Sequence, residues 1–266
     1  MELQQSPIYA KYIASLGWQI IVQDGVRMFY KKIPLIGGLL KIQRPKKLPR
    51  IPDIDIKTIA IEPTEKQNMA AYKKWVSTIG KKYRVVRSEY MPTKTILVDL
   101  TPPEEIIFSR FSEAKRRAVR KAQKNGVTIR ESSDIKELIS VKNKSGGFFG
   151  FITTHGTDKF WEIMKSEHAT TLLAYRKQKL VGGVLVIFWG NTAFYWIAGA
   201  ISDGKKYSAP TLLVWEALKL AKSRGAKKFD FVGVWDERKP GDHHDWKGFT
   251  RFKEGFGGYT LYWPIF

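Results

Sequence analysis

The stretch TTLLAYRKQKLVGGVLVIFWGNTAFYWIA, residues 170–198, decides the fold class of this chain. Its three apolar runs, Thr170–Tyr175, Leu180–Trp189 and Thr192–Ala198, are rich in β-branched and aromatic residues. This pattern predicts three antiparallel strands, with a tight turn at Gly190-Asn191. The uncharged span 180–201 is also long enough for a membrane-crossing helix, but its internal glycines favour two buried strands instead.

The segments around this meander predict an α/β fold. Thr101-Pro102-Pro103-Glu104 has the cap, the proline and the acidic first turn of a helix start, so we expect one helix from there to Lys124. The other elements expected after residue 93 are strands at 95–100, 127–131, 229–234 and 259–266, and helices at 133–142, 158–166 and 209–224.

Residues 1–93 predict shorter elements. We expect helices at 9–16 and 64–80, and strands or extended segments at 17–23, 26–32, 56–61 and 84–88. The stretch Ile33–Ile42 is apolar apart from Lys41 and contains Gly37-Gly38, and we assign no element to it. The proline-rich basic stretch Arg44–Pro52 fits either a solvated loop or a phosphate contact.

The charge balance indicates which partners to expect. Among 266 residues, 46 Lys and Arg stand against 25 Asp and Glu, which gives a formal net charge of +21. Such an excess predicts a polyanionic partner: nucleic acid, an anionic membrane surface or a phosphorylated substrate. The absence of cysteine excludes disulfides, cysteine zinc sites and thiol nucleophiles. Met1–Ala10 does not have the pattern of a signal peptide, so we expect a cytoplasmic protein, with contact at the inner face of the membrane as an alternative.

The densest basic cluster lies in the helix expected to end at Lys124. Arg116, Arg120 and Lys124 recur at helical spacing, with Arg117 and Lys121 beside them, and the nearby acid is Glu113. A solvated helix face usually mixes both signs of charge, so this cluster favours contact with phosphates or nucleic acid.

Other candidate sites carry weaker signals. Asp242-His243-His244-Asp245 could suggest a metal, but neighbouring loop residues point in different directions, and we expect no metal. The run Gly204–Thr211 occupies the place of an acetyl-CoA phosphate loop, yet it lacks paired glycines and Pro210 removes a donor, so no cofactor is expected. In Gly248–Gly258, glycines and aromatics alternate around Arg251 and Lys253. That stretch fits either a loop closing the core or a channel in which Lys253 stabilises negative charge.

Two of these stretches together resemble a known family. Asp230–Val234 followed by Gly248–Gly258 is similar to the C-terminal signature of the Fem family, the aminoacyltransferases that form peptidoglycan bridges from aminoacyl-tRNA. The supporting stretches are Thr95–Leu100, Lys115–Val127, Phe194–Ala200 and Leu212–Ala217. The likeness is closer over residues 94–266 than over residues 1–93.

The resemblance implies a fold and a reaction. The fold would be two tandem GNAT-like acyltransferase domains with mixed, largely antiparallel sheets: 1–93 on the acceptor side, and 94–266 with the Fem signature and a last strand returning to the first domain. The reaction would move an amino acid from aminoacyl-tRNA to an amino group of a UDP-linked or lipid-linked muramyl peptide, as in cell-wall bridge formation. The long helical hairpin of some family members is missing, so no tRNA contact is assigned to such an arm.

The resemblance also implies roles for residues. Lys253 would stabilise the oxyanion or the leaving ribose oxygen, and Phe252 would shape the channel. The tRNA contacts would be Arg116, Arg117, Arg120 and Lys121, and the substrate-binding residues would be Lys31, Lys32, Arg44, Tyr195, Asp230 and Asp236. Lys31, Lys32 and Arg44 would hold a pyrophosphate, and Asp230 or Asp236 would relay the amine proton. The alternatives are an acceptor that is a protein N-terminus or phosphatidylglycerol, a non-catalytic RNA-binding module, and a CoA-dependent acetyltransferase.

Overall fold

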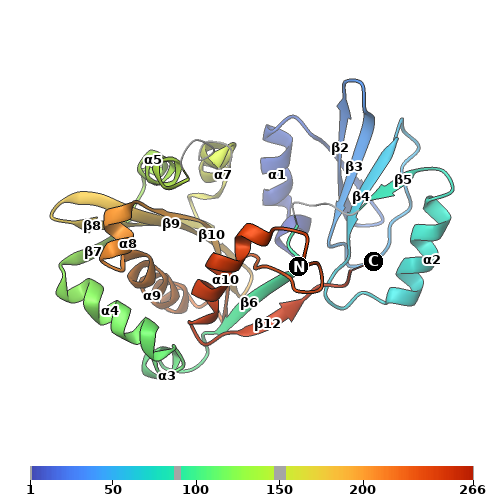
Figure 1. Ribbon diagram of the computed structural model, residues 1–266. Coiled ribbons are helices and arrows are strands. Elements are labelled where there is room, and N and C mark those ends of the chain that lie inside the picture. Colours follow the sequence, from blue (N-terminus) through green and yellow to red (C-terminus); the bar gives the residue numbers. More distant parts are fainter. Residues whose placement is uncertain (1, 87–90, 147–153, 266) are drawn as a thin grey trace. The chain divides into compact units, whose positions relative to one another are not determined.

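The computed structural model describes residues 2–86, 91–146 and 154–265, and the chain divides into two compact units (Figure 1). The first unit consists of Met1–Thr93 and Tyr262–Phe266, and the second of Lys94–Leu261. Each unit holds one sheet flanked by helices, and most neighbouring strands are antiparallel. The predicted mixed α/β class is therefore confirmed.

The first unit is built on a five-stranded sheet in the order β1-β2-β3-β4-β5. Its elements are η1 Leu3–Gln5, α1 Pro7–Ser15, β1 Gln19–Gln23, β2 Val26–Ile33, β3 Gly37–Gln43, β4 Thr58–Glu62, α2 Met69–Ile79 and β5 Arg84–Val86. β1, β2 and β3 pair antiparallel, whereas β4 and β5 add in parallel. Residues 87 and 88 of the extended segment expected at 84–88 lie outside the described residues.

The strand β3 overlaps the apolar stretch Ile33–Ile42, to which the sequence assigned no element. The glycine pair there favours a break in secondary structure, but the structure uses it for close packing. A Cβ atom at Gly38 would lie 1.9 Å from the carbonyl oxygen of Asp55, so only glycine lets the two backbones approach.

The second unit is built on a seven-stranded sheet in the order β12-β6-β11-β10-β9-β8-β7. Its strands are β6 Lys94–Asp99, β7 Val127–Ser132, β8 Ala169–Arg176, β9 Lys179–Trp189, β10 Thr192–Ala200, β11 Lys228–Asp230 and β12 Tyr259–Tyr262. β8 to β10 form the predicted antiparallel meander, and Gly190, with φ 57°, makes the tight turn between β9 and β10. β7 extends this series by pairing antiparallel with β8. In the described parts of the chain, no helix combines the length and apolar character needed to cross a membrane.

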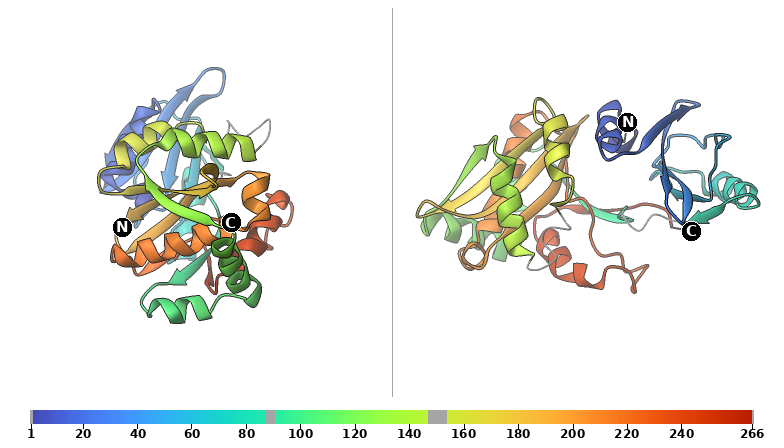
Figure 2. Two further views of the ribbon diagram at one scale, coloured as in Figure 1. Left: turned by 90° about the vertical axis from the view of Figure 1, so that its left-hand side faces the viewer. Right: turned by 90° about the horizontal axis from the view of Figure 1, so that it is seen from above.

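Helices cover both faces of this sheet (Figures 1 and 2). They are α3 Glu104–Ser109, α4 Glu113–Lys124, α5 Ile135–Ser145, α7 Thr157–Met164, α8 Ser202–Lys206, α9 Ala209–Ser223 and α10 Lys247–Glu254, with a short η3 at His244–Trp246. Neighbouring strand residues face opposite sides, and a Cβ at Gly182 would contact Leu213 of α9 while one at Gly183 would contact Leu138 of α5. α5 and α9 therefore lie on opposite faces.

The single helix expected to end at Lys124 is in fact two helices, α3 and α4. The chain breaks between them because Phe111 is buried in the core and Ser112 caps α4, its Oγ accepting a hydrogen bond from the backbone N–H of Lys115 at 3.4 Å. The break was missed because the apolar positions of the two helices together mimic one continuous helical face.

The C-terminal part also departs from the sequence prediction. Gly248–Gly258 contains a helix, α10, rather than only a loop. β11 ends at Asp230 instead of continuing to Val234. β12 lies in the second sheet, next to β6, and the segment grouped with the first unit begins at Tyr262.

Candidate active site

A pocket of about 650 Å³ opens in the second unit where β10 and β11 part. The two strands pair in parallel over a short stretch that ends at Phe194 opposite Asp230. β10 then continues to Ala200, with a bulge after Tyr195 that shifts its register against β9. The pocket is lined by residues 195–200 of β10 and by side chains of α10, namely Phe249, Phe252 and Lys253.

Lys253 reaches this pocket with its amino group bound to backbone. The residue is only 8% exposed, and its Nζ donates hydrogen bonds of 2.7 Å each to the carbonyl oxygens of Phe231 and Gly233. These two carbonyls converge because the chain turns sharply after β11, with φ 52° at Val232 and φ 94° at Gly233. A β-branched residue strongly disfavours positive φ, and strain of this kind clusters at functional sites.

Asp230 and Thr95 hold this turn. Asp230 Oδ1 accepts hydrogen bonds from the backbone N–H of Val232 at 2.8 Å and from Thr95 Oγ1 at 2.5 Å. Thr95 Oγ1 in turn accepts from the backbone N–H of Gly233 at 3.2 Å. Asp230 thus positions the carbonyls that bind Lys253 and does not itself line the pocket.

The pKa of Lys253 lies close to neutral pH. Burial lowers its pKa to about 7, although the Asp230 carboxylate favours the charged form; the positive charge of Lys142 lowers the pKa further. In either protonation state two N–H groups can serve the two carbonyls. The remaining position on Nζ is an N–H donor in the ammonium form and a lone pair in the amine form. A substrate atom there would therefore meet a hydrogen-bond donor or a proton acceptor, depending on pH.

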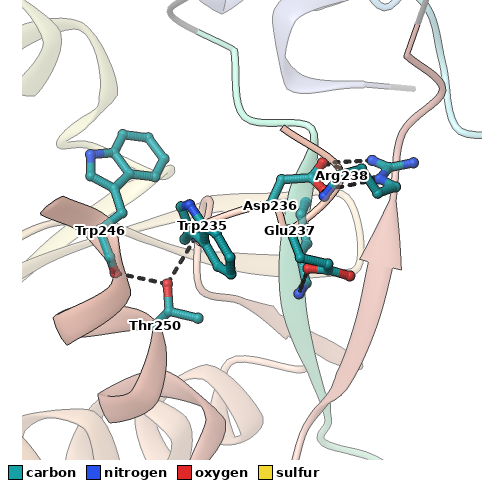
Figure 3. A network of polar contacts seen from close by, with 7 residues as sticks. Trp235, Asp236, Glu237, Arg238, Trp246 and Thr250 are labelled. Carbon is teal, nitrogen blue, oxygen red and sulfur yellow. Dashed lines mark hydrogen bonds and ion pairs between the residues drawn. The ribbon is translucent and has the colours of Figure 1, made fainter. Parts of the chain in front are cut away.

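Hydrogen bonds fix α10 to the segment that follows β11 (Figure 3). Thr250 Oγ1 accepts from the backbone N–H of Trp235 and donates to the carbonyl oxygen of Trp246, both at 2.8 Å. Thr250 lies three residues before Lys253 and, like it, is buried. This contact therefore helps to determine where the lysine stands.

The second predicted acid, Asp236, lies away from the pocket lining. Its carboxylate forms an ion pair with Arg238 at 2.7 Å, and its Oδ1 also accepts from the backbone N–H of Arg238. Glu237 of the same segment forms an ion pair with Lys94 of β6. The structure thus gives Asp236 a role in shaping the segment and does not bring it to Lys253.

Aromatic rings shape the pocket near Lys253. Phe252 contacts Phe256 edge-on at a centroid distance of 5.2 Å, and the Nζ of Lys115 lies 3.8 Å from the Phe252 ring centroid. Burial lowers the pKa of Lys115 to about 8. Tyr195 packs edge-on against Phe231, and burial raises the pKa of its phenol. Three predicted residues, Tyr195, Phe252 and Lys253, therefore line one pocket.

Two lysines that the sequence did not single out also line the pocket: Lys142 of α5 and Lys205 of α8. Burial lowers the pKa of Lys142, and the charge of Lys205 lowers it further. Together with Lys253 they outnumber the acidic lining residue Asp245, so the pocket suits an anionic ligand. Each lysine sits on a different helix, and no spacing in the sequence could have joined them.

The run Gly204–Thr211 does not form a phosphate cradle. Its first residues belong to α8, and its last residues form the first turn of α9, with Pro210 inside it. The backbone N–H groups of Lys205 and Tyr207 donate to the carbonyl oxygens of Ile201 and Asp203.

The predicted tRNA-binding residues of α4 differ in their surroundings. Arg116 donates to the carbonyl oxygens of Ser109, at 2.8 Å, and Phe111, so it joins α3 to α4. Arg117 pairs with Glu113 at 2.5 Å. Arg120 and Lys121 are exposed and present their charge to solvent. None of the four lines the pocket.

The predicted pyrophosphate-binding residues of the first unit are also separated. Lys31 donates to the carbonyl oxygen of Leu16 at 3.1 Å, and Lys32 pairs with Asp55 at 3.5 Å. Neighbours on a strand face opposite sides, so the two lysines do not share a face. Arg44 is 6% exposed, and its guanidinium stacks 3.7 Å from the ring centroid of Trp263. Arg44 therefore serves the packing of its unit.

The histidine-containing loop has other contacts. His243 stacks on Trp246 at a centroid distance of 4.1 Å, and His244 Nε2 lies 3.0 Å from Lys247 Nζ. Across the residues that the structure describes, no three His, Cys, Asp or Glu side chains come together in a way that could hold a metal ion.

Comparisons with known proteins bear on this site. The FemAB family model matches residues 162–262, which include β10, β11 and α10, and no curated protein sequence matches the chain. The crystal structure of FemX aligns with a TM-score of 0.76 at 16% identity, covering 98% of this chain and 90% of that one. The C-terminal domain of a putative lysylphosphatidylglycerol synthetase from Agrobacterium fabrum aligns with a TM-score of 0.57 at 11% identity, covering 94% and 84%.

A tandem GNAT protein from the clavulanic acid biosynthesis pathway aligns with a TM-score of 0.50 at 11% identity, covering 90% of this chain and 77% of that one. At such identities the three structures establish a shared fold. The tandem acyltransferase-like fold is thereby confirmed, and the family match confirms the resemblance to the Fem family over the C-terminal region.

Proposed function

We propose, from the FemAB-family sequence of the C-terminal region and the fold shared with FemX, that the chain is an aminoacyltransferase. It moves an amino acid from aminoacyl-tRNA to an amino group of a peptidoglycan precursor. The observation that carries this proposal is the setting of Lys253. The residue that the resemblance marks as functional lines the pocket, buried and bound to two backbone carbonyls.

The reaction needs no covalent enzyme intermediate. The amino nitrogen of the acceptor attacks the ester carbonyl that joins the amino acid to the tRNA ribose. A C–N bond forms, the ester C–O bond breaks, the amine gives up one proton and the leaving ribose oxygen gains one. Charged Lys253 donates its remaining N–H to the oxygen that becomes negative in the transition state, while Phe252 confines the reacting groups.

Positive charge supports an RNA donor. Lys142 and Lys205 line the pocket, and Arg120 and Lys121 on α4 are exposed, so phosphates can meet cations at both places. For the acceptor, we assign the pyrophosphate contact to the exposed Lys32, because Lys31 faces the other side of the sheet and donates to Leu16, and the guanidinium of Arg44 is engaged with Trp263.

The test mixes the purified protein with bulk tRNA charged with labelled amino acids. One tube contains UDP-linked muramyl pentapeptide, and another contains its lipid-linked form. We expect label on one precursor, detected by mass, and its loss with the Lys253→Met variant but not with Lys73→Gln, which removes an exposed charge of α2. Binding of tRNA without transfer to either precursor would overturn the proposed acceptor, and failure to bind tRNA would overturn the donor.

A second candidate acceptor is the headgroup of phosphatidylglycerol. It is favoured by the fold shared with a protein named as a putative lysylphosphatidylglycerol synthetase. The donor and the role of Lys253 stay the same, since both reactions break the same ester. Adding phosphatidylglycerol vesicles to a third tube separates the two, because the label then moves to extractable lipid.

A further inference from the structure

The turn between β2 and β3 presents an apolar tip to solvent. Pro34, Leu35 and Ile36 form this tip, and the backbone N–H of Ile36 closes it by donating to the carbonyl oxygen of Ile33 at 3.2 Å. Leu35 is 108% exposed and Ile36 is 63% exposed. Single exposed apolar residues are common on protein surfaces, so a function needs a second observation.

The second observation is the backbone of Leu35, whose φ is 65°. In this left-handed region the Cβ of an L-residue crowds the backbone, so glycine and asparagine are preferred. Glycine or asparagine would strain the backbone of this turn less than leucine does, and would expose less apolar surface to water. Leucine here stabilises neither the turn nor the core of its unit, which indicates a contact outside the unit.

Lysines and a tryptophan surround the base of this tip. Lys31 and Lys32 lie opposite Leu39 and Gly38 in the β2–β3 pairing, and Lys57 packs beside Gly37, where a Cβ would lie 2.4 Å from its Cγ. Trp18 lies close by, with Lys31 Nζ 5.7 Å from its ring centroid. The excess of positive charge extends through the unit, because residues 1–93 hold 17 Lys and Arg against 7 Asp and Glu.

We propose that this tip docks into the surface of an anionic lipid bilayer. Leu35 and Ile36 enter the acyl boundary, and the exposed Lys32 and Lys57 behind them reach lipid phosphates. Trp18 has the amphipathic ring that favours a membrane interface. Charge argues against a second copy of this chain, since two lysine-ringed tips repel. The apolar residues argue against RNA, which offers phosphates but no apolar interior.

Docking does not require the proposed reaction, so it is tested on the full chain without tRNA. Vesicle flotation compares phosphatidylcholine alone with mixtures that contain equal fractions of phosphatidylglycerol or phosphatidylserine. We expect binding to both anionic mixtures, weaker binding at high salt, and little binding to phosphatidylcholine. Equal binding to phosphatidylcholine would overturn the proposal, as would binding to phosphatidylglycerol alone, which would indicate recognition of one headgroup.

The variants separate docking from folding. Leu35→Asn with Ile36→Ser removes the apolar tip while favouring the left-handed turn, so binding should fall at least about tenfold with no loss of melting temperature. The matched control is Val22→Thr, because Val22 is 59% exposed on the same sheet but pairs opposite Arg27, at the other end of β2. Unchanged binding by the tip variant would overturn the proposal.

A direct readout uses the absence of native cysteine. Ile36→Cys and Val22→Cys can each carry one environment-sensitive dye. On anionic vesicles we expect a blue-shifted, brighter emission only from the label at position 36. A shift at both positions or at neither, or a shift at position 36 that appears with protein concentration instead of vesicles, would overturn docking through the tip.

Discussion

The lysine of α10 and the basic face of α4 use positive charge in opposite ways. On α4, six cations fall within Lys115–Lys124, yet Arg116 and Arg117 are occupied locally and Arg120 and Lys121 face water. On α10, Lys253 is buried and lines a single pocket. Exposed cations are screened by salt and each contributes modestly to binding a polyanion, whereas a buried cation can act strongly on one atom. A dense cluster of basic residues in a sequence thus indicates a charged surface, whereas the burial of one lysine in a pocket indicates a role in a reaction.

The sharpest test of this difference is Lys253→Met, which keeps the length of the side chain and removes the charge. We expect single-turnover transfer from aminoacyl-tRNA to fall about 10²–10³-fold, the usual effect of losing one transition-state donor. Stability should change less, because removing a buried charge offsets leaving two carbonyls without their donor. Lys73→Gln, which also removes one positive charge but at an exposed position of α2, is the control. An unchanged rate would remove Lys253 from the mechanism.

The pH dependence tests which form of Lys253 acts. Since burial lowers its pKa to about 7, the charged form is lost as pH rises through 7. If the ammonium stabilises the transition state, single-turnover transfer should fall about tenfold per pH unit above that point. Lys253→Arg stays charged and should lack this fall. A rate that rises through pH 7 would instead assign a proton-accepting role to the amine.

A smaller effect is expected from loosening α10. Thr250→Val keeps the shape of the side chain but leaves the backbone N–H of Trp235 without its acceptor. An unsatisfied buried donor costs about 1–3 kcal/mol, so the denaturation midpoint in urea should fall. Thr250→Ser retains the hydroxyl and should fall less. Equal midpoints for the two variants would mean that the hydrogen bond does not stabilise α10.

The smallest effect is expected on the basic face. Replacing Arg120 and Lys121 together by glutamine should weaken tRNA binding several-fold. The slope of log K against the logarithm of the salt concentration should become shallower by about one for each lost phosphate contact. Arg116→Gln should instead lower thermal stability, because Arg116 joins α3 to α4. Filter binding at several salt concentrations measures the first effect. An unchanged salt slope would place the RNA elsewhere.

Strong periodic signals were predicted well from the sequence. The prediction of the meander of β8, β9 and β10 was correct because its β-branched runs are long and a glycine marks the turn. The helix α9 was found for a similar reason, since it has a continuous apolar face and a glycine beyond its end. These elements form the frame on which the pocket stands.

The pocket itself was only partly predictable. The Fem-like motif pointed to Phe252-Lys253, but the glycines and aromatics around them obscured the helix α10. The carbonyls that hold Lys253 depend on positive φ at Val232, which residue type does not suggest. Lys142 and Lys205 join the site only through the packing of α5 and α8, and tertiary contacts of this kind leave no local pattern.

The position of β6 in its sheet has a consequence for synthesis. It is the first strand of the second unit, yet its two neighbours, β11 and β12, follow all the other strands of this sheet in the chain. Its edges therefore remain open until the C-terminal segment arrives, and folding of this unit must await long-range pairing. In the sequence, α10 lies between β11 and β12, so the sheet and the lysine pocket are completed together. A chain that ends before Lys247 therefore lacks both the complete sheet and the pocket lysine Lys253.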